Sequence, residues 1–500
     1  MIKGIRLKFG RNRSSIPVPI ETTPVTVFVG PNNSGKSKAL SEIWRYCLDG
    51  RRNSRDVIID SIEFSPCSQD EADRRISQVT QLPRRNEAVA PGHIVVGTRD
   101  TRTNCVRSLL LSSLQKPEGD IQAFCHNYLR FKTLMLNGEN RIRLTREQIA
   151  GNLQDVGQTS FQVLFGDNSR RENVRKIIHD AFGVYFVIDP TNLGKLRLKL
   201  SNRLPSNELE ERGIHDAAVR FHADALPIED ASDGIKAFTG MITEIVAGDP
   251  DVLLIDEPEA FLHPSLSNKL GKEIAQASSH SNKRVFVATH SSDFVMGCIQ
   301  SGASVNIVRL TYRAGEATAR VLPNEDILRL MRNPLLRSTG VLQGLFYEFV
   351  VVTEGDADRA FYQEINNRLL RYKVDGGISS CLFVNAQNKQ TVQTIVEPLR
   401  RLGIPTAGIV DIDILKDGGS TWSGFLRGAS VPEISHQPLG SQRAAIKNKL
   451  ESTGKDMNWT VPGCPCGGYP INRNSGILET SAFSTMNFSR SWDPCLTTRN

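Results

Sequence analysis

The chain has 500 residues, of which 39% are hydrophobic and 23% charged, and its formal net charge is +7. This length suffices for about three domains, and the composition excludes disordered and fibrous classes. No apolar run approaches the roughly 20 residues of a membrane helix, and the N-terminal segment lacks a signal-peptide core, so we expect a cytoplasmic protein without a membrane partner. The nine scattered cysteines argue against a disulfide framework.

The first strong motif follows an apolar strand expected at residues 24–29. The sequence GPNNSGKS, residues 30–37, fits the pattern G-x-x-x-x-G-K-[ST], and a helix pattern follows it. In such a loop backbone N–H groups face phosphates, while the lysine adds a positive charge and the final serine can hold Mg²⁺. The alternative is a glycine-rich turn with an incidental lysine, which the flanking strand and helix disfavour. The predicted ATP-binding residues are Gly30, Asn32, Asn33, Gly35, Lys36 and Ser37, and Ser37 is also a predicted metal ligand.

Signals are mixed from about residue 50 to residue 225, which predicts an α/β insertion of unknown role. Asp167 is placed to cap a helix, and two alternating apolar runs around residues 192–194 predict a hairpin. A second hairpin is expected around Ala314 and Gly315.

Regular alternation of strands and helices returns at residue 251. Four apolar residues, 252–255, end in Asp256 and Glu257. We expect Asp256 to be a Mg²⁺ ligand and Glu257 to orient or deprotonate the attacking water. Two acids in a solvated turn are the alternative, but a phosphate-binding loop upstream makes it the weaker interpretation.

The segment IDEPEAFLHP, residues 255–264, resembles the Walker B region of ABC-type ATPases. Two further segments resemble elements of that class: ASDGIK at 231–236 is similar to its signature, and THSSD at 289–293 is similar to its switch-histidine loop. The resemblance implies that Ser232 and Gly234 reach ATP on the opposite subunit and that His290 contacts the γ-phosphate. It therefore implies a homodimer or a higher homo-oligomer.

A second acidic cluster is expected further along the chain. A buried strand at 349–353 ends in Glu354, with Asp358 one helical turn later. Another strand is expected from Thr406 to Ile412, and the two-residue period would place Asp411 and Asp413 on the same face. Clustered carboxylates repel unless a cation neutralises them, and oxygen ligands favour Mg²⁺ or Mn²⁺. The alternative is a solvated sheet edge. The predicted metal ligands here are Glu354, Asp358, Asp411 and Asp413, of which Glu354, Asp411 and Asp413 are also predicted to be catalytic.

The pairing of a strand-end glutamate with a later Asp-x-Asp resembles the TOPRIM domain. An ABC-type ATPase followed by TOPRIM resembles the overcoming lysogenization defect (OLD) family, which implies an ATP-regulated DNA endonuclease in anti-phage defence, with a second defence protein as a further partner. The expected fold is α/β, with an ABC-type P-loop ATPase domain followed by a Rossmann-like TOPRIM domain. The expected boundaries are 1–335 for the ATPase domain, 346–450 for TOPRIM and 451–500 for a weakly patterned tail.

The chain departs from the family pattern after Asp413. Family members use a late lysine at the scissile phosphate, and the candidates here are Lys447, Lys449 and Lys455. The main alternative is an ATPase scaffold or sensor with a degenerate TOPRIM domain. A topoisomerase or primase is disfavoured because no tyrosine nucleophile region or zinc motif is evident, and Cys464 and Cys466 lack a second pair of ligands. A repair clamp would require long heptad repeats, which the insertion lacks.

Overall fold

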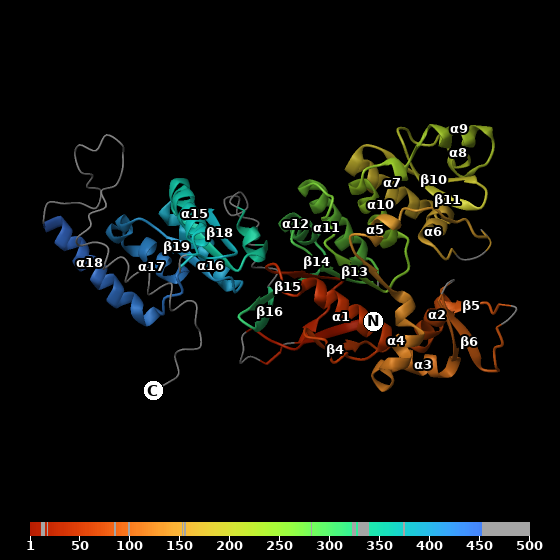
Figure 1. Ribbon diagram of the computed structural model, residues 1–500, viewed down its shortest axis with the longest axis horizontal. Helices are drawn as coiled ribbons and strands as arrows, with labels where there is room; N and C mark the ends of the chain where they lie inside the picture. Colours follow the sequence, from red (N-terminus) through yellow and green to blue (C-terminus); the bar gives the residue numbers. More distant parts are fainter. Residues whose placement is uncertain are drawn as a thin grey trace. The chain divides into compact units, whose positions relative to one another are not determined.

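The computed structural model describes residues 1–452 except for 12–15, 18, 85–86, 99–100, 153, 155–156, 282, 323–326, 329–339 and 374–375. The chain forms two compact units, Met1–Asn324 and Glu325–Asn500, each of which has its own sheet and helices (Figure 1). The expected boundary near residues 333–344 falls largely outside the described residues. In the part of the chain that is described, no helix is both long and apolar enough to cross a membrane.

The first unit is built on a six-stranded sheet in the order β16-β15-β3-β14-β13-β8. All neighbours in it are parallel except β15 and β16, which form an antiparallel hairpin at the edge. The central strands are continuous apolar runs because both faces of a parallel sheet are covered by helices. The strands are β3 (Val25–Val29), β8 (Thr133–Leu136), β13 (Val252–Asp256), β14 (Arg284–Ala288), β15 (Val305–Arg313) and β16 (Glu316–Leu322).

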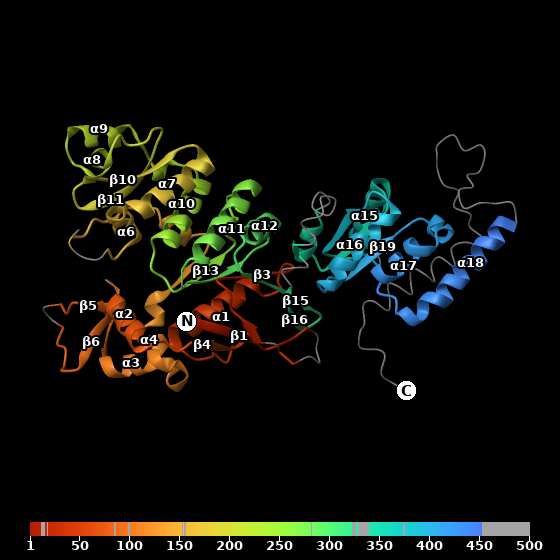
Figure 2. The same cartoon turned by 180° about the vertical axis from the view of Figure 1, so that it is seen from behind.

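Helices cover both faces of this sheet (Figures 1 and 2). The helix α1 (Lys36–Asp49) packs against β8, β13 and β14 on one face, while α11 (Pro264–Ser279) and α12 (Ser292–Gln300) lie together over the other. A small antiparallel sheet of β1 (Ile2–Leu7), β2 (Pro19–Glu21) and β4 (Ile59–Phe64) shares one apolar core with α1. The carboxyl ends of β3, β13 and β14 therefore meet at one edge, where the P-loop leaves β3.

The insertion expected from about residue 50 to residue 225 is not one separate block. Strands β4 and β8 lie within this range but belong to the two sheets described above, and most of the remainder forms two lobes. One is the sheet β5-β6-β7 with three helices and a 3-10 turn, and the other is the sheet of β9 to β12 with four helices. The first comprises α2 (Gln69–Val79), β5 (Thr80–Gln81), β6 (His93–Gly97), β7 (Arg102–Val106), α3 (Arg107–Gln115), η1 (Pro117–Gly119) and α4 (Ile121–Asn127). The second comprises β9 (Gln148–Ile149), α6 (Ser160–Gly166), α7 (Asn168–Phe182), β10 (Tyr185–Asn192), β11 (Lys195–Ser201), α8 (Glu208–Arg212), α9 (Asp216–Asp224) and β12 (Leu226–Pro227).

The local predictions for the first unit are confirmed. The Asp167 side chain caps α7 by accepting a hydrogen bond from the N–H of Arg170 at 3.1 Å. Strands β10 and β11 pair antiparallel across Leu193 and Gly194, and β15 and β16 pair across Ala314 and Gly315, whose φ angles are 49° and 83°. Positive φ at both central positions is the geometry of a tight hairpin turn.

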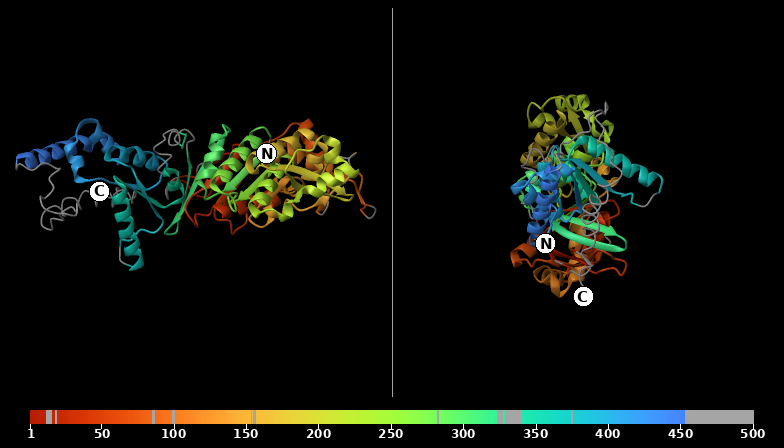
Figure 3. Two further views of the ribbon diagram at one scale, coloured as in Figure 1. Left: turned by 90° about the horizontal axis from the view of Figure 1, so that it is seen from above. Right: turned by 90° about the vertical axis from the view of Figure 1, so that its left-hand side faces the viewer.

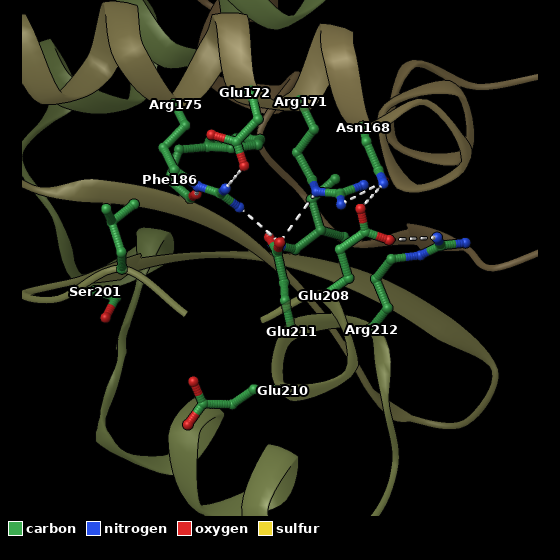
Figure 4. Close-up of polar contacts among 12 residues, drawn as sticks. Asn168, Arg171, Glu172, Arg175, Phe186, Ser201, Glu208, Glu210, Glu211 and Arg212 are labelled. Atoms are coloured by element: carbon green, nitrogen blue, oxygen red, sulfur yellow. Dashed lines mark hydrogen bonds and ion pairs between the residues drawn. The ribbon is translucent and has the colours of Figure 1, made fainter. Parts of the chain in front are cut away.

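A buried ionic cluster joins α7 to α8 in the second lobe (Figure 4). Glu211 is 1% exposed and lies between two buried arginines: Arg171 Nε donates to its Oε2 at 3.1 Å, and Arg175 Nη2 donates to the same oxygen at 2.6 Å. The backbone N–H of Ile188 donates to the other oxygen of Glu211 at 3.3 Å. One carboxylate therefore contacts two arginines and the backbone of strand β10.

Replacing Glu211 with alanine is expected to lower the free energy of unfolding by about 3–5 kcal/mol, because it leaves buried arginines without their counter-charge. Chemical denaturation measures this change. The control is Glu172→Ala, which removes an Arg175 partner that is 61% exposed and should cost less than about 1 kcal/mol. If both variants lost the same free energy of unfolding, the burial of Glu211 would not be what makes its replacement costly.

The second unit holds a parallel three-stranded sheet in the order β18-β17-β19. Strand β17 lies in the middle of this sheet, with β18 on one side and β19 on the other. The helix α15 joins β17 to β18, and α16 joins β18 to β19 in the opposite direction across the sheet. Because such crossovers are right-handed, the two helices lie on opposite faces (Figure 3). The elements are η4 (Val341–Phe346), β17 (Phe349–Thr353), α15 (Asp356–Arg371), β18 (Cys381–Asn385), α16 (Lys389–Arg401), β19 (Thr406–Ile409), η5 (Ile412–Lys416), α17 (Gly419–Gly428), η6 (Glu433–Ser435) and α18 (His436–Ser452).

One strand prediction for this unit is wrong. The strand expected from Thr406 to Ile412 ends at Ile409, and Asp411 instead precedes η5. The partner strand β17 ends at Thr353, opposite Ile409, so the following residues have no neighbouring strand to pair with. The strand period therefore does not place Asp411 and Asp413 on a shared face.

The predicted C-terminal features are only partly described. Lys447 and Lys449 lie on α18, whereas Lys455, Cys464 and Cys466 lie outside the described residues.

Candidate nucleotide and metal sites

The P-loop joins β3 to α1 in a conformation that needs glycine at two positions. Gly30 has φ +144°, and a Cβ there would lie 2.0 Å from the carbonyl oxygen of Leu310. Gly35 has φ +94° and immediately precedes α1. Asn32 and Asn33 are exposed at the tip of the loop. The loop therefore turns its backbone tightly into the N-terminus of α1, where anions are favoured.

The Lys36 side chain folds back into this loop. Its Nζ donates to the carbonyl oxygens of Gly30 at 2.9 Å and Pro31 at 2.8 Å, and the residue is 5% exposed. Burial lowers the pKa of Lys36 to about 8, against the opposing effect of Glu257, Asp256 and Glu259. The ammonium is thus held where phosphate oxygens would meet it.

Nucleotide affinity is expected to fall as the pH rises above about 8, because the free protein then loses the Lys36 charge while bound phosphate favours the charged form. The dissociation constant of a fluorescent ATP analogue should increase by up to about tenfold per pH unit. Lys36→Arg is the control, since a guanidinium stays charged in this range and should give a flatter profile. An unchanged wild-type dissociation constant from pH 7 to 9.5 would contradict the role of Lys36.

Ser37 and Asp256 form the first predicted metal site. Ser37 Oγ donates to Asp256 Oδ1 at 2.9 Å, although the two residues lie 219 positions apart in the sequence. Burial raises the pKa of Asp256, and Glu257 adds to the effect. A hydroxyl and a carboxylate at the P-loop are the oxygen ligands that Mg²⁺ takes beside phosphates, so the residues present fit this ion.

Glu257 and His290 face one another across the same edge. The N–H of Glu257 donates to the carbonyl oxygen of Ala288 at 2.8 Å, and its Oε1 lies 3.9 Å from His290 Nε2. Burial lowers the pKa of His290, with Lys36 acting in the same direction. A neutral imidazole beside a carboxylate can accept or donate a hydrogen bond at the γ-phosphate position.

Glu259 was not singled out from the sequence, yet it positions the histidine loop. Its Oε2 accepts from Thr289 Oγ1 at 2.8 Å and its Oε1 accepts from the N–H of His290 at 2.7 Å. Burial raises the pKa of Glu259. The sequence gave no reason to single out Glu259 from the two acids before it, because the residues that donate hydrogen bonds to it lie some 30 positions away.

The predicted signature residues begin the helix α10 (Asp233–Val246). Ser232 is exposed and caps this helix, with its Oγ accepting from the N–H of Ile235 at 3.4 Å. A Cβ on Gly234 would lie 2.6 Å from the carbonyl oxygen of Phe261, so this helix start packs closely on the segment after Glu257. The exposed Ser232 hydroxyl is available to a second molecule.

In the second unit, the predicted acids lie at the point where strand order reverses. Glu354 directly follows β17 and Asp411 follows β19, the neighbouring strand. The Glu354 Oε2 accepts a hydrogen bond from the N–H of Asp411 at 3.2 Å. Open parallel sheets bind ligands at this carboxyl edge.

Asp358 and Tyr362 border the same edge. Asp358 Oδ2 accepts from the N–H of Gly355 at 3.1 Å and so caps α15. Burial raises the pKa of Tyr362, and the charges of Asp358 and Asp411 add to this effect. Tyr362 was not predicted as a site residue.

The potential metal ligands at this edge are carboxylate oxygens, which suit a divalent cation. Among the described side chains no three acidic, histidine or cysteine residues are already grouped to hold one; the Asp413 side chain is not among them. Lys389, at the start of α16, adds a cation nearby and pairs with Asp417 Oδ2 at 3.0 Å.

Two protein-domain families match parts of the chain. Residues 160–297 match "AAA domain, putative AbiEii toxin, Type IV TA system", and residues 345–413 match "Overcoming lysogenization defect protein-like, TOPRIM domain".

Two curated proteins are similar to parts of the chain. The Old nuclease of Escherichia phage P2 is 27% identical over 176 residues, which cover 33% of this chain and 28% of that protein. Endonuclease GajA of Bacillus cereus (strain HuB5-5) is 22% identical over 193 residues, which cover 33% of this chain and 27% of that protein. The chain thus matches less than a third of either relative's length.

Solved structures similar to this chain include two SMC heads. The SmcHead bound to the C-winged helix domain of ScpA has a TM-score of 0.39 and 17% identity, covering 66% of this chain and 99% of that chain. The SMC head domain from Thermotoga maritima has a TM-score of 0.32 and 13% identity, covering 64% and 99%.

Proposed function

We propose that this chain is an ATP-regulated, divalent-metal-dependent DNA endonuclease of the OLD type in anti-phage defence, and the matches to an AAA domain, to an OLD-like TOPRIM domain and to parts of two nucleases support this proposal. The observation that carries the nuclease is the contact between Glu354 and the N–H of Asp411 at the carboxyl edge of the TOPRIM sheet. It brings together two acids 57 positions apart where this type of sheet binds ligands.

At the ATPase site, Lys36 and the P-loop amides bind the phosphates of ATP, and Ser37 and Asp256 hold Mg²⁺. Glu257 accepts a proton from the attacking water, and His290 donates a hydrogen bond to the γ-phosphate. The 2.9 Å contact between Ser37 and Asp256 supports this arrangement.

The exposed Ser232 and the neighbouring Gly234 supply the closing contacts to ATP on a second copy of the chain. The protein therefore acts as a homodimer or a higher homo-oligomer. The exposure of the Ser232 hydroxyl at a helix N-terminus supports this proposal, because phosphate oxygens are favoured there.

At the TOPRIM site, Glu354, Asp411, Asp413 and Asp358 would hold Mg²⁺ or Mn²⁺. Held there, a divalent cation would supply activation of the attacking water and neutralisation of the leaving oxygen of the phosphodiester. The Oδ2 of Asp358 accepts from the Gly355 N–H, and Glu354 Oε2 accepts from the N–H of Asp411. The substrate is DNA, and the cationic Lys389 lies near the edge where its phosphate would approach.

One observation favours the alternative, an ATPase sensor whose TOPRIM domain does not cut. The Oδ2 of Asp358 accepts from the Gly355 N–H, so one oxygen of this carboxylate is engaged as a helix cap. In that case the ATPase unit would control a partner protein.

A plasmid-cleavage assay distinguishes the endonuclease from the ATPase sensor. Wild-type protein is incubated with plasmid DNA and Mg²⁺ or Mn²⁺, with and without ATP, beside Glu354→Ala and Lys36→Ala. Metal-dependent cutting that Glu354→Ala abolishes supports the nuclease, and Lys36→Ala should lose ATP turnover together with any response of cutting to ATP. Intact ATP turnover without cutting under any condition would favour the sensor.

A further inference from the structure

An arginine from the loop after β8 lies beneath the ATPase site, where the predicted mechanism has no use for it. Arg141 is 1% exposed and belongs to the short helix α5 (Asn140–Arg143). Its Nη1 donates to the carbonyl oxygen of Glu257, 116 positions away. Its guanidinium carbon lies 5.7 Å from the centre of the Phe261 ring.

The surroundings of this guanidinium are unusual for a structural arginine. Its Nε is buried without a hydrogen-bond partner among the described residues. Burial lowers the pKa of Arg141, and Glu259, Glu257 and Asp256 oppose this effect. A buried cation with so little local compensation is costly to stability, so its position calls for another role.

Glu257 needs support from outside its own strand. Its φ is +51°, in the left-handed region that is unfavourable for a residue with a Cβ. Its N–H is held by the Ala288 carbonyl and its carbonyl by Arg141, so both backbone groups are anchored. These two hydrogen bonds fix the backbone from which the carboxylate projects.

The same arginine connects this glutamate to the signature helix. A Cβ on Gly240 of α10 would lie 2.9 Å from the carbonyl oxygen of Arg141 and 3.0 Å from Cβ of Leu144, so α5 and α10 are in close contact. At the start of α10, Gly234 lies against the carbonyl of Phe261, the residue beneath the guanidinium. Helix α10 is thereby connected to Glu257 through two close contacts.

We propose that Arg141 is a positioning residue that couples the orientation of Glu257 to the signature helix α10 of the same chain. When Ser232 and Gly234 engage ATP on a second copy, α10 and α5 move together, and Arg141 carries Glu257 into register with the attacking water. This inference rests on the proposed ATPase function and names a regulatory contact within that site.

The test is steady-state ATP hydrolysis by the full-length protein carrying Arg141→Met, which keeps an unbranched apolar stem and removes the charge and the donors. We expect kcat to fall by about tenfold to 100-fold, as misplaced catalytic groups do, with KM and the dissociation constant of an ATP analogue changed less than about threefold. Arg141→Lys should recover part of kcat. Gly240→Ala, which keeps the arginine and pushes α5 from α10, should also lower kcat and spare binding.

Arg171→Met is the matched control, because Arg171 is equally buried and its loss leaves the Glu211–Arg175 pair intact. Its kcat should stay within about twofold of wild type even if its melting temperature falls. Equal kcat losses in Arg141→Met and Arg171→Met, or a wild-type kcat in folded Arg141→Met, would overturn the positioning role. A wild-type kcat in Gly240→Ala would overturn the link to α10.

Lys36→Ala separates this inference from the function on which it rests. If Lys36→Ala abolishes turnover while Arg141→Met leaves it unchanged, the ATPase site stands and the coupling fails. If Lys36→Ala retains turnover, the proposed ATPase site itself is wrong.

Discussion

Replacing Glu257 with glutamine is expected to lower ATP turnover by about 100-fold or more while ATP binding persists. Glutamine keeps the shape of the side chain and the backbone contacts to Ala288 and Arg141, but it cannot accept a proton from water. Bound ATP would then persist, and the proposed dimer should accumulate. Phosphate release measures turnover, and light scattering with ATP measures the dimer.

The matched control for this change is Glu118→Gln, which alters an exposed glutamate in the same unit. It should leave turnover within about twofold of wild type, because surface substitutions away from a site have small effects. Turnover by Glu257→Gln at the wild-type rate would assign the base to another residue.

Replacing Glu354 with alanine is expected to lower DNA cleavage by about 100-fold or more. The loss of a ligand removes several kcal/mol of charge stabilisation from the reaction, and each 1.36 kcal/mol changes the rate tenfold. ATP turnover should remain, because the ATP-site residues belong to the other unit of the chain. Conversion of supercoiled plasmid over time gives the rate, and titration with Mn²⁺ shows whether metal affinity falls in parallel.

Asp356→Ala provides a control two residues away with the same change in charge. The Asp356 side chain is 68% exposed and pairs with Arg359, so its loss should leave cleavage nearly unchanged. Equal cleavage losses in both variants would point to a general effect on the start of α15, and full cleavage by Glu354→Ala would remove Glu354 from the site.

Structural elements whose residues are consecutive in the chain were predictable from the sequence. The P-loop and the Asp256–Glu257 pair each combine a buried strand with the residues that immediately follow it, so local pattern and chemistry coincide. The β10–β11 and β15–β16 hairpins and the Asp167 cap were predictable for the same reason, since each depends on only a few neighbouring residues.

The prediction failed where a strand depended on a distant partner. Residues Thr406 to Ile412 have the composition of a strand along their whole length, but β17 ends opposite Ile409. Strand length is a property of the pair, so a pattern in one segment could not locate that end. Glu259 and Arg141 were missed for a related reason, because their hydrogen-bond partners lie 30 or more positions away.

By itself, the sequence determined that the chain contains a P-loop, a paired Walker B strand and a later acidic strand end, because short-range periodicity and turn chemistry encode such elements. Only the tertiary structure decided which side chains meet. It joined Ser37 to Asp256, Glu354 to Asp411 and Arg141 to Glu257, since parallel crossovers bring strand ends together over separations that no local pattern records.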